Sequence, residues 1–247
     1  MPESDPQNAN DQYADATMRR RLEDVEDRIR SACNRAGRDR DAVTLIAVSK
    51  THPTEAIERL YEQGVRAFGA SYVQEWEEKV GQVPDDIDWH FVGHLQSNKA
   101  RDVVDRMAFI HSVDRRSVMK QLNKRTESTV DVLLQINIAG QESKSGVEPD
   151  ELSALIDTAE DYPNLNIRGL MTLPPHADDP EDNRDFFRRM RALFDDASTL
   201  LEQSAVHDVA GFDHLSMGMT NDFEVAIEEG ATMIRLGTAL FGPRDYD

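Results

Sequence analysis

The chain has 247 residues and a formal net charge of −19 at neutral pH. That length is usual for one α/β barrel, and a chain of this size buries enough surface to fold without disulfide or metal. Cys33 is the single cysteine, which excludes an internal disulfide and suits a reducing compartment. A surface this acidic repels phosphate backbones, so we expect no nucleic-acid partner.

No stretch approaches the roughly 20 continuous apolar residues that span a bilayer, and the first residues lack the basic start and apolar run of a signal peptide. We therefore expect a cytoplasmic protein with no membrane partner. Only six of the 28 basic residues are lysines. The acidic excess indicates either attraction for cationic partners or adaptation to a salty cytosol, where screening removes self-repulsion, and we favour the second.

Residues 1–12 are polar and rich in Asp, Asn and Pro, so we expect a disordered tail followed by one domain over residues 13–247. From Thr17, apolar residues recur at helical spacing: Met18, Leu22, Val25, Ile29 and Cys33. This stripe predicts an extra N-terminal helix that docks on the core, and Gly37 ends it. We expect Cys33 to serve packing alone.

Short apolar runs then alternate with longer amphipathic stretches. The strand candidates are Val43–Val48, Arg66–Gly69, Trp89–Val92, Phe109–Val113, Val130–Ile138, Ile167–Leu173, His214–Met217 and Met233–Leu236. The helix candidates begin near Thr54, Tyr72, Ser97, Arg115, Pro149, Pro180 and Asp222. Eight strands separated by helices predict an α/β fold, a parallel (β/α)₈ TIM barrel with right-handed crossovers. A doubly wound open sheet is the alternative.

The C-terminal ends of the strands build the site in such a barrel. Lys50 follows the apolar run VTLIAVS, so its side chain begins where the barrel interior ends. Partial desolvation there favours the neutral amine that attacks an aldehyde. The alternative is a lysine that extends into solvent. We favour the functional interpretation because the chain contains so few lysines.

Two segments, HLSMGMTND and IRLGTALFG, place small and hydroxyl residues at the ends of strands seven and eight. Barrels commonly bind phosphate at these ends through backbone N–H groups and hydroxyls. The residues that fit this need are Ser216, Gly218, Thr220, Gly237 and Thr238. A phosphate at one end and the Lys50 amine at the other would bracket a molecule such as pyridoxal 5′-phosphate (PLP).

Arg235 lies within the apolar run MIRLG. It either faces the outer helices or directs its guanidinium at the ligand. A cation facing a pyridine nitrogen would keep that nitrogen unprotonated, and the ring would then be a poor electron sink. The second orientation therefore argues against carbanion chemistry.

Seven histidines raise the question of a metal site. His90 and His94 are four residues apart in WHFVGHLQSNK, but a strand followed by a loop does not bring them to one helical face. We therefore expect no metal site. His94, at a strand end, is the candidate site residue of the pair.

Taken together, several segments resemble the pyridoxal phosphate homeostasis protein family between Val43 and Arg244. They are VTLIAVSKTHP, FGASYVQEWEEKV, WHFVGHLQSNKAR, HSVDR, LLQINIAGQESKSGV, IRGLMTLPP and LSMGMTNDFEVAIEEGATMIRLGTALFGPR. The family's fold resembles the barrel domain of alanine racemase, the alanine racemase N-terminal domain type, and that of bacterial-type ornithine decarboxylase. The resemblance thus implies the fold class that the periodicity predicts.

The resemblance implies a cofactor, PLP, held as an aldimine on Lys50. It also implies phosphate binding by Ser216, Gly237 and Thr238, a place for Arg235 near the pyridine nitrogen, and pocket-lining segments that contain Ser71, His94 and Met217. One departure matters: the family usually reads GENYVQE after the second strand, whereas this chain reads GASYVQE. Ala70 and Ser71 thus replace a Glu and an Asn.

Family members are known as PLP carriers or regulators of vitamin B6 balance without an established catalytic activity. The resemblance therefore implies a PLP-binding protein. We expect it to be a monomer, with PLP-dependent apo-enzymes as candidate recipients. The first alternative is a PLP-dependent amino-acid racemase or decarboxylase. A racemase of this kind needs a second acid/base, a tyrosine from an additional domain, and no tyrosine here has a clear route to that role. The second alternative is an interaction protein that binds nothing covalently.

Overall fold

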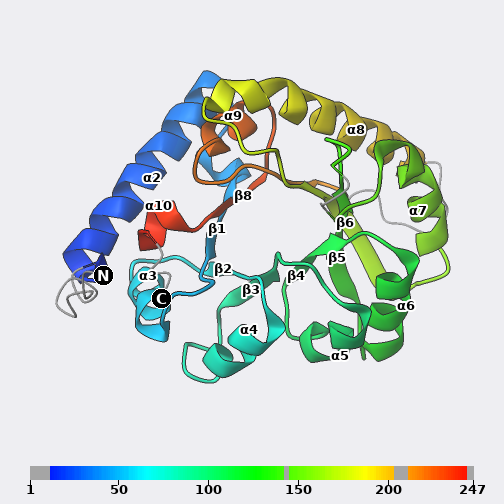
Figure 1. The fold of residues 1–247 in the computed structure, drawn as a ribbon, viewed down its shortest axis with the longest axis horizontal. Coiled ribbons are helices and arrows are strands. Elements are labelled where there is room, and N and C mark those ends of the chain that lie inside the picture. Colours follow the sequence, from blue (N-terminus) through cyan, green and yellow to red (C-terminus); the bar gives the residue numbers. More distant parts are fainter. Residues whose placement is uncertain (1–11, 142–144, 203–210, 244–247) are drawn as a thin grey trace, which may run out of the picture.

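The computed structural model describes residues 12–141, 145–202 and 211–243. Apart from Gln12, the tail expected over residues 1–12 lies outside these residues. The described chain begins with helix α2 (Asp15–Arg35) and then alternates strands with helices around a closed barrel (Figure 1).

The strands of the barrel are β1 (Thr44–Val48), β2 (Ala67–Ala70), β3 (Asp88–Phe91), β4 (Phe109–Val113), β5 (Val130–Ile136), β6 (Leu165–Thr172), β7 (His214–Ser216) and β8 (Met233–Leu236). They pair in chain order, each parallel to its neighbours, and β1 pairs with β8 to close the ring. The predicted (β/α)₈ barrel is therefore confirmed, and the open sheet is excluded.

The helices outside the barrel are α3 (Thr54–Glu62), α4 (Val73–Val80), α5 (Ala100–Val103), α6 (Arg116–Arg125), α7 (Leu152–Ala159), α8 (Arg184–Glu202), α9 (Phe223–Glu228) and α10 (Thr238–Phe241). Single 3₁₀ turns are η1 (Arg40–Ala42), η2 (Ser97–Lys99), η3 (Pro149–Glu151) and η4 (Pro180–Asn183). The sequence pattern does not predict α10, because four residues are too few to show a helical period. Among the described helices, none combines the length and the apolar character needed to cross a bilayer.

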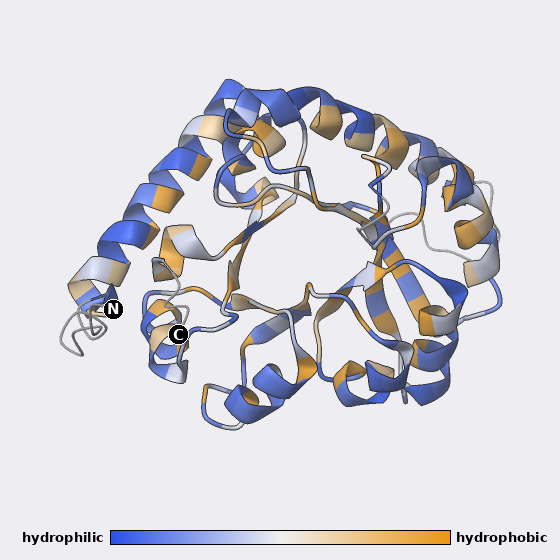
Figure 2. Cartoon of the chain, in the orientation of Figure 1, coloured by the Kyte–Doolittle hydropathy of each residue, from blue (hydrophilic) through white to orange (hydrophobic). Residues whose placement is uncertain are grey.

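The apolar side chains form two layers because side chains alternate across each strand. Inside the barrel, Ile46 packs with Leu133, Met171 and Met233. Outside it, the intervening strand positions pack with the helices, whose apolar faces turn inward (Figure 2). Full burial of each large apolar side chain contributes about 1.5–3 kcal/mol, so the two layers together stabilise the ring.

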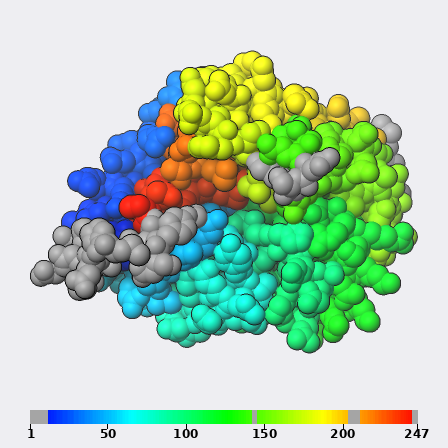
Figure 3. Space-filling view, viewed as in Figure 1, coloured from blue at the N-terminus to red at the C-terminus, as the bar shows by residue number. Residues whose placement is uncertain are grey.

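Helix α2 covers the side of the barrel where the two ends of the described chain meet. The predicted stripe is its buried face: Met18, Val25, Ile29 and Cys33 are buried, and Leu22 is half-buried. This face packs against α9 and α10, and Figure 3 shows the C-terminal segment lying directly against α2. Burial raises the pKa of the Cys33 thiol, which agrees with a packing role.

Candidate functional site

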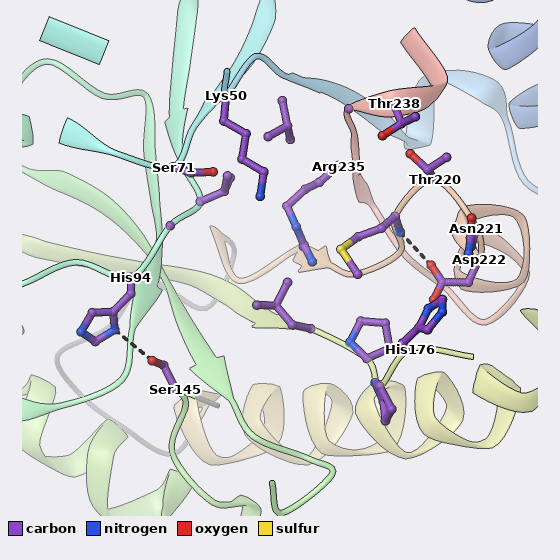
Figure 4. A pocket seen from close by; sticks show the side chains of 18 of the residues that line it. Lys50, Ser71, His94, Ser145, His176, Thr220, Asn221, Asp222, Arg235 and Thr238 are labelled. Carbon is purple, nitrogen blue, oxygen red and sulfur yellow. Dashed lines mark hydrogen bonds between the residues drawn. The ribbon is translucent and has the colours of Figure 1, made fainter. Parts of the chain in front are cut away.

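A cavity of about 750 Å³ opens at the C-terminal ends of the strands. Its wall consists of strand ends and the loops that follow them, which is where barrels of this class place their sites (Figure 4). The volume lies in the range of small-molecule pockets. The wall contains these predicted site residues: Lys50, Ser71, His94, Arg235, Gly237 and Thr238.

Strand periodicity explains the floor of this cavity. Four side chains that point into the barrel at the same height along its axis form the apolar cluster Ile46, Leu133, Met171 and Met233. The inward positions two residues further along the same strands line the cavity: Val48, Gln135, Leu173 and Arg235. The apolar level therefore fills the barrel beneath the site and seals it from the opposite end.

Lys50 is the second residue after β1, and its side chain points into the cavity (Figure 4). The next residue, Thr51, has a φ of +66°, a left-handed conformation that costs a non-glycine residue about 1–2 kcal/mol. The Thr51 N–H donates to Glu75 Oε1 (2.6 Å), and Lys79 Nζ donates to Glu75 Oε1 (2.5 Å) and to the Ser49 carbonyl (3.1 Å). The Glu75–Lys79 ion pair, here called the Lys50 strut, thus holds the backbone on both sides of Lys50.

Arg235 points into the barrel and reaches the cavity from below, so it does not face the outer helices. Its guanidinium donates to Ser216 Oγ (2.5 Å) and to the Thr172 carbonyl (2.8 Å). Only 4% of the residue is exposed, and this burial lowers the pKa of Arg235 to about 10. The group therefore remains a fixed cation at neutral pH.

Ser216 and Met217 lie away from the cavity wall. Ser216 is fully buried, and its hydroxyl accepts from Arg235, because a guanidinium can only donate. Met217 has the opposite strand parity and packs among the apolar side chains that face the helices. In the structure, Ser216 therefore positions Arg235, and Met217 belongs to the outer core.

Two histidines extend this buried chain of polar groups. Ser216 Oγ lies 3.0 Å from His111 Nδ1, and His111 Nε2 lies 2.9 Å from His90 Nδ1. Burial lowers the pKa of His90 to about 4 and holds that of His111 well below its ordinary value. Both rings are therefore neutral. The described part of the chain contains no group of three or more His, Cys, Asp or Glu residues arranged to hold a metal.

The other end of the cavity is formed by the loops after β7 and β8. The Arg235 N–H donates to the Gly218 carbonyl (3.1 Å), which holds the two loops side by side. Gly218 has a φ of +91°, and an added Cβ would lie 2.6 Å from Ala226 Cβ, so glycine is required there. Thr220 and Thr238 face one another across this end (Figure 4). Their hydroxyls supply donors suited to an anion.

His94 and Ser71 lie on the wall formed by β2 and β3. His94 Nδ1 is 2.9 Å from Ser145 Oγ, which joins the loops after β3 and β5. Ser71 follows β2, and its carbonyl approaches Gly93 so closely that an added Cβ would lie 1.9 Å from it. Ala70 instead packs in the outer apolar layer. Of the two unusual residues in GASYVQE, only Ser71 therefore lines the cavity.

The wall also contains residues that the sequence analysis did not single out as site residues: Tyr72, Gln135, Ser145, Pro174, Pro175, His176, Met219, Asn221 and Asp222. Tyr72 is the tyrosine among the described residues that lines this cavity, and the sequence pattern does not assign it a place there. Because α4 begins only three residues after β2 ends, Tyr72 remains at the rim, where 60% of it is exposed. The Pro-Pro pair that begins two residues after the end of β6 was the available sequence signal for that part of the wall.

Comparison with known proteins identifies the family. The chain matches the family described as "Alanine racemase, N-terminal domain" over residues 21–245. It is 44% identical over 230 residues to the pyridoxal phosphate homeostasis protein of Aquifex aeolicus, covering 92% of this chain and 98% of that protein. The chain belongs to the pyridoxal phosphate homeostasis protein family.

Solved structures extend the comparison. An unknown protein from Bifidobacterium adolescentis has a TM-score of 0.82 and 30% identity, covering 97% of this chain and 98% of that one. PipY of Synechococcus elongatus PCC7942, solved with PLP bound, has a TM-score of 0.73 and 34% identity, covering 88% of this chain and 100% of that one. The family's barrel is thus conserved in this chain along nearly its whole length.

Proposed function

We propose that this chain binds PLP through Lys50 and serves intracellular PLP homeostasis without catalytic turnover. The main observation behind the proposal is that Lys50, the buried Arg235 and two threonines that face one another all line the same cavity. The PLP-bound structure of PipY and the name of the Aquifex aeolicus relative support it.

The donor set of this chain fits PLP. The Lys50 amine supplies the nucleophile for the aldehyde. Gly237, Thr238 and Thr220 supply backbone and hydroxyl donors for the phosphate at the far end. Arg235 lies between these ends and would face the ring nitrogen. When bound, PLP supplies an electron sink, and a fixed cation at its nitrogen weakens that sink by opposing protonation.

This electrostatic argument favours a carrier over an enzyme. Ser216 and the Thr172 carbonyl hold the Arg235 cation in place, so it cannot turn away from the ligand. A racemase or decarboxylase is the alternative, and Tyr72 at the rim is the residue in its favour because a phenol can move a proton. Within the proposal, the chain acts as a monomer in the cytoplasm and supplies PLP to apo-enzymes.

Reduction and peptide mapping test the proposal directly. Protein incubated with PLP and reduced with borohydride should carry one phosphopyridoxyl group, which digestion and mass spectrometry should locate on Lys50. The PLP-loaded protein should convert no L-alanine to D-alanine above the rate of free PLP. A label confined to other lysines would overturn the binding proposal, whereas D-alanine formed at an enzymatic rate would establish the racemase.

A second test concerns the role of the Lys50 strut in PLP binding. Lys79→Met removes the donor to the Ser49 carbonyl and leaves Glu75 without its cation. We expect PLP affinity to fall by about tenfold, since a charged hydrogen bond contributes about 1.5–3 kcal/mol. The backbone on either side of Lys50 would also be held less firmly, so the amine would be less well positioned. Affinity is measured by absorbance titration. Lys79→Arg, which keeps the charge, should restore part of the affinity, and equal affinities for the Met variant and wild type would contradict the role of the strut.

A further inference from the structure

A basic segment stands out in this acidic chain. Residues 97–125 contain eight Lys or Arg and only three Asp or Glu, although the whole chain has a net charge of −19. They include three of the six lysines: Lys99, Lys120 and Lys124. The segment forms η2, α5, β4 and α6, which lie together on one side of the barrel (Figure 1). A general bias toward acidic residues does not explain a local excess of the opposite sign.

A second cavity, of about 490 Å³, lies within this segment. Its lining residues are Ser97, Asn98, Lys99, Arg101, Gln121 and Arg125. It shares none of them with the cavity that holds Lys50. The first three belong to the motif WHFVGHLQSNK, so one part of the motif supplies His94 to the first cavity and the next part builds the second.

Positive charge in the second cavity exceeds the negative charge that faces it. Asp102 is the carboxylate paired with two of the lining cations: its oxygens lie 3.6 Å from Lys99 Nζ and 3.0 Å from Arg101 Nε. For Arg125, at the end of α6, the described residues provide no ion-pair partner. Lys99 and Arg101 thus share one carboxylate, and an anionic ligand would balance the positive charge that remains.

We propose that this second cavity binds a compact phosphoryl anion of the size of pyrophosphate. Arginine forks match phosphoryl oxygens in pairs, and lysine adds a point charge. Ser97, Asn98 and Gln121 supply neutral donors between the cations. Among the described residues, none that lines this cavity has an aromatic or aliphatic side chain on which a nucleobase could stack. These features favour a small, highly charged ligand over a nucleotide or a polypeptide.

Calorimetric titration of the PLP-loaded protein with inorganic pyrophosphate at low KCl tests this proposal. Prior loading with PLP occupies the first cavity. We expect one pyrophosphate per chain, with affinity reduced about tenfold by Arg125→Gln, because a bidentate charged contact is lost. Rising KCl should also weaken binding through screening. Thermal unfolding of each variant checks that it is folded.

Lys124→Gln is the matched control. Lys124 is the sequence neighbour of Arg125, is also exposed, and carries the same charge, but it does not line the cavity. We expect its affinity to stay within about twofold of wild type, because only general electrostatics change. Equal losses in the two variants would overturn the site, as would the absence of pyrophosphate binding. Binding of a short RNA or of poly-glutamate instead, with the same dependence on Arg125, would also overturn it.

Discussion

Replacing Lys50 with alanine should abolish the absorbance band that the wild-type protein gains when PLP is added. The band requires a covalent link between the PLP aldehyde and an amine, and Lys50 is the one lysine among the described residues that lines the cavity. Contacts to the phosphate would remain at Thr220 and Thr238, so the variant should retain weak non-covalent binding. Absorbance spectra of the variant and wild type, recorded after removal of free PLP, measure the effect.

Lys120→Ala is the matched control, because Lys120 is an exposed lysine of α6 outside both cavities. It should keep the wild-type spectrum. A ligand at 100 times its Kd stabilises a protein by about 2.7 kcal/mol. At that PLP concentration, wild type and Lys120→Ala should therefore melt at a clearly higher temperature than Lys50→Ala. An unchanged band in Lys50→Ala would refute the assignment of Lys50.

Gly169→Ala should cause the second large loss, this time of stability. Gly169 lies in β6 at a φ of +152°, and an added Cβ would lie 1.7 Å from the His214 carbonyl oxygen of β7. Left-handed strain and overpacking together predict a loss of about 3 kcal/mol or more in the free energy of unfolding. Urea denaturation followed by circular dichroism measures this loss.

Gly81→Ala provides the comparison for this substitution. Gly81 follows α4 at a φ of −85°, and an added Cβ would meet nothing within 4 Å. Its unfolding free energy should remain within about 0.5 kcal/mol of wild type, as for most surface substitutions. If both alanine variants unfolded at the same urea concentration, that result would contradict the close approach of β6 and β7 at Gly169.

The position of Gly169 also decides which side chains of β6 face the site. The register between β5 and β6 shifts there. Before the shift, Ile167 packs toward the helices, whereas Met171, four residues later, faces the barrel interior and Leu173 lines the cavity. If side chains alternated regularly along β6, Ile167, Met171 and Leu173 would all lie on the same face of the strand. The sequence pattern indicates a strand here but not its irregularity, which appears only in the pairing of β6 with β5.

The strand positions were predictable because burial on both faces leaves an apolar run in the sequence. β4 and β8 have the predicted bounds, and each of the other strands differs from its predicted bounds by one or two residues at one end or both. Lys50 was predictable for a related reason: a charged residue directly after such a run must lie at the mouth of the barrel. These conclusions need only local sequence.

The surroundings of Arg235 were not predictable in the same way. The register between β7 and β8 places Ser216 beneath Arg235. Because side chains alternate along a strand, the next residue, Met217, then faces the helices. Tyr72 reached the wall because the loop after β2 is short. The Lys50 strut joins residues 49–51 to α4 and has no signature in the spacing of those residues.

The sequence by itself therefore determined the order of strands and helices, the closed barrel and the lysine at the end of β1, because apolar periodicity and strand ends are properties of neighbouring residues. Only the tertiary structure decided which groups surround that lysine: Arg235 fixed by Ser216, the threonines of two loops brought together, and a second, basic cavity between η2 and α6. Those contacts join residues distant in the chain, and their geometry follows from how the strands and helices pack in three dimensions.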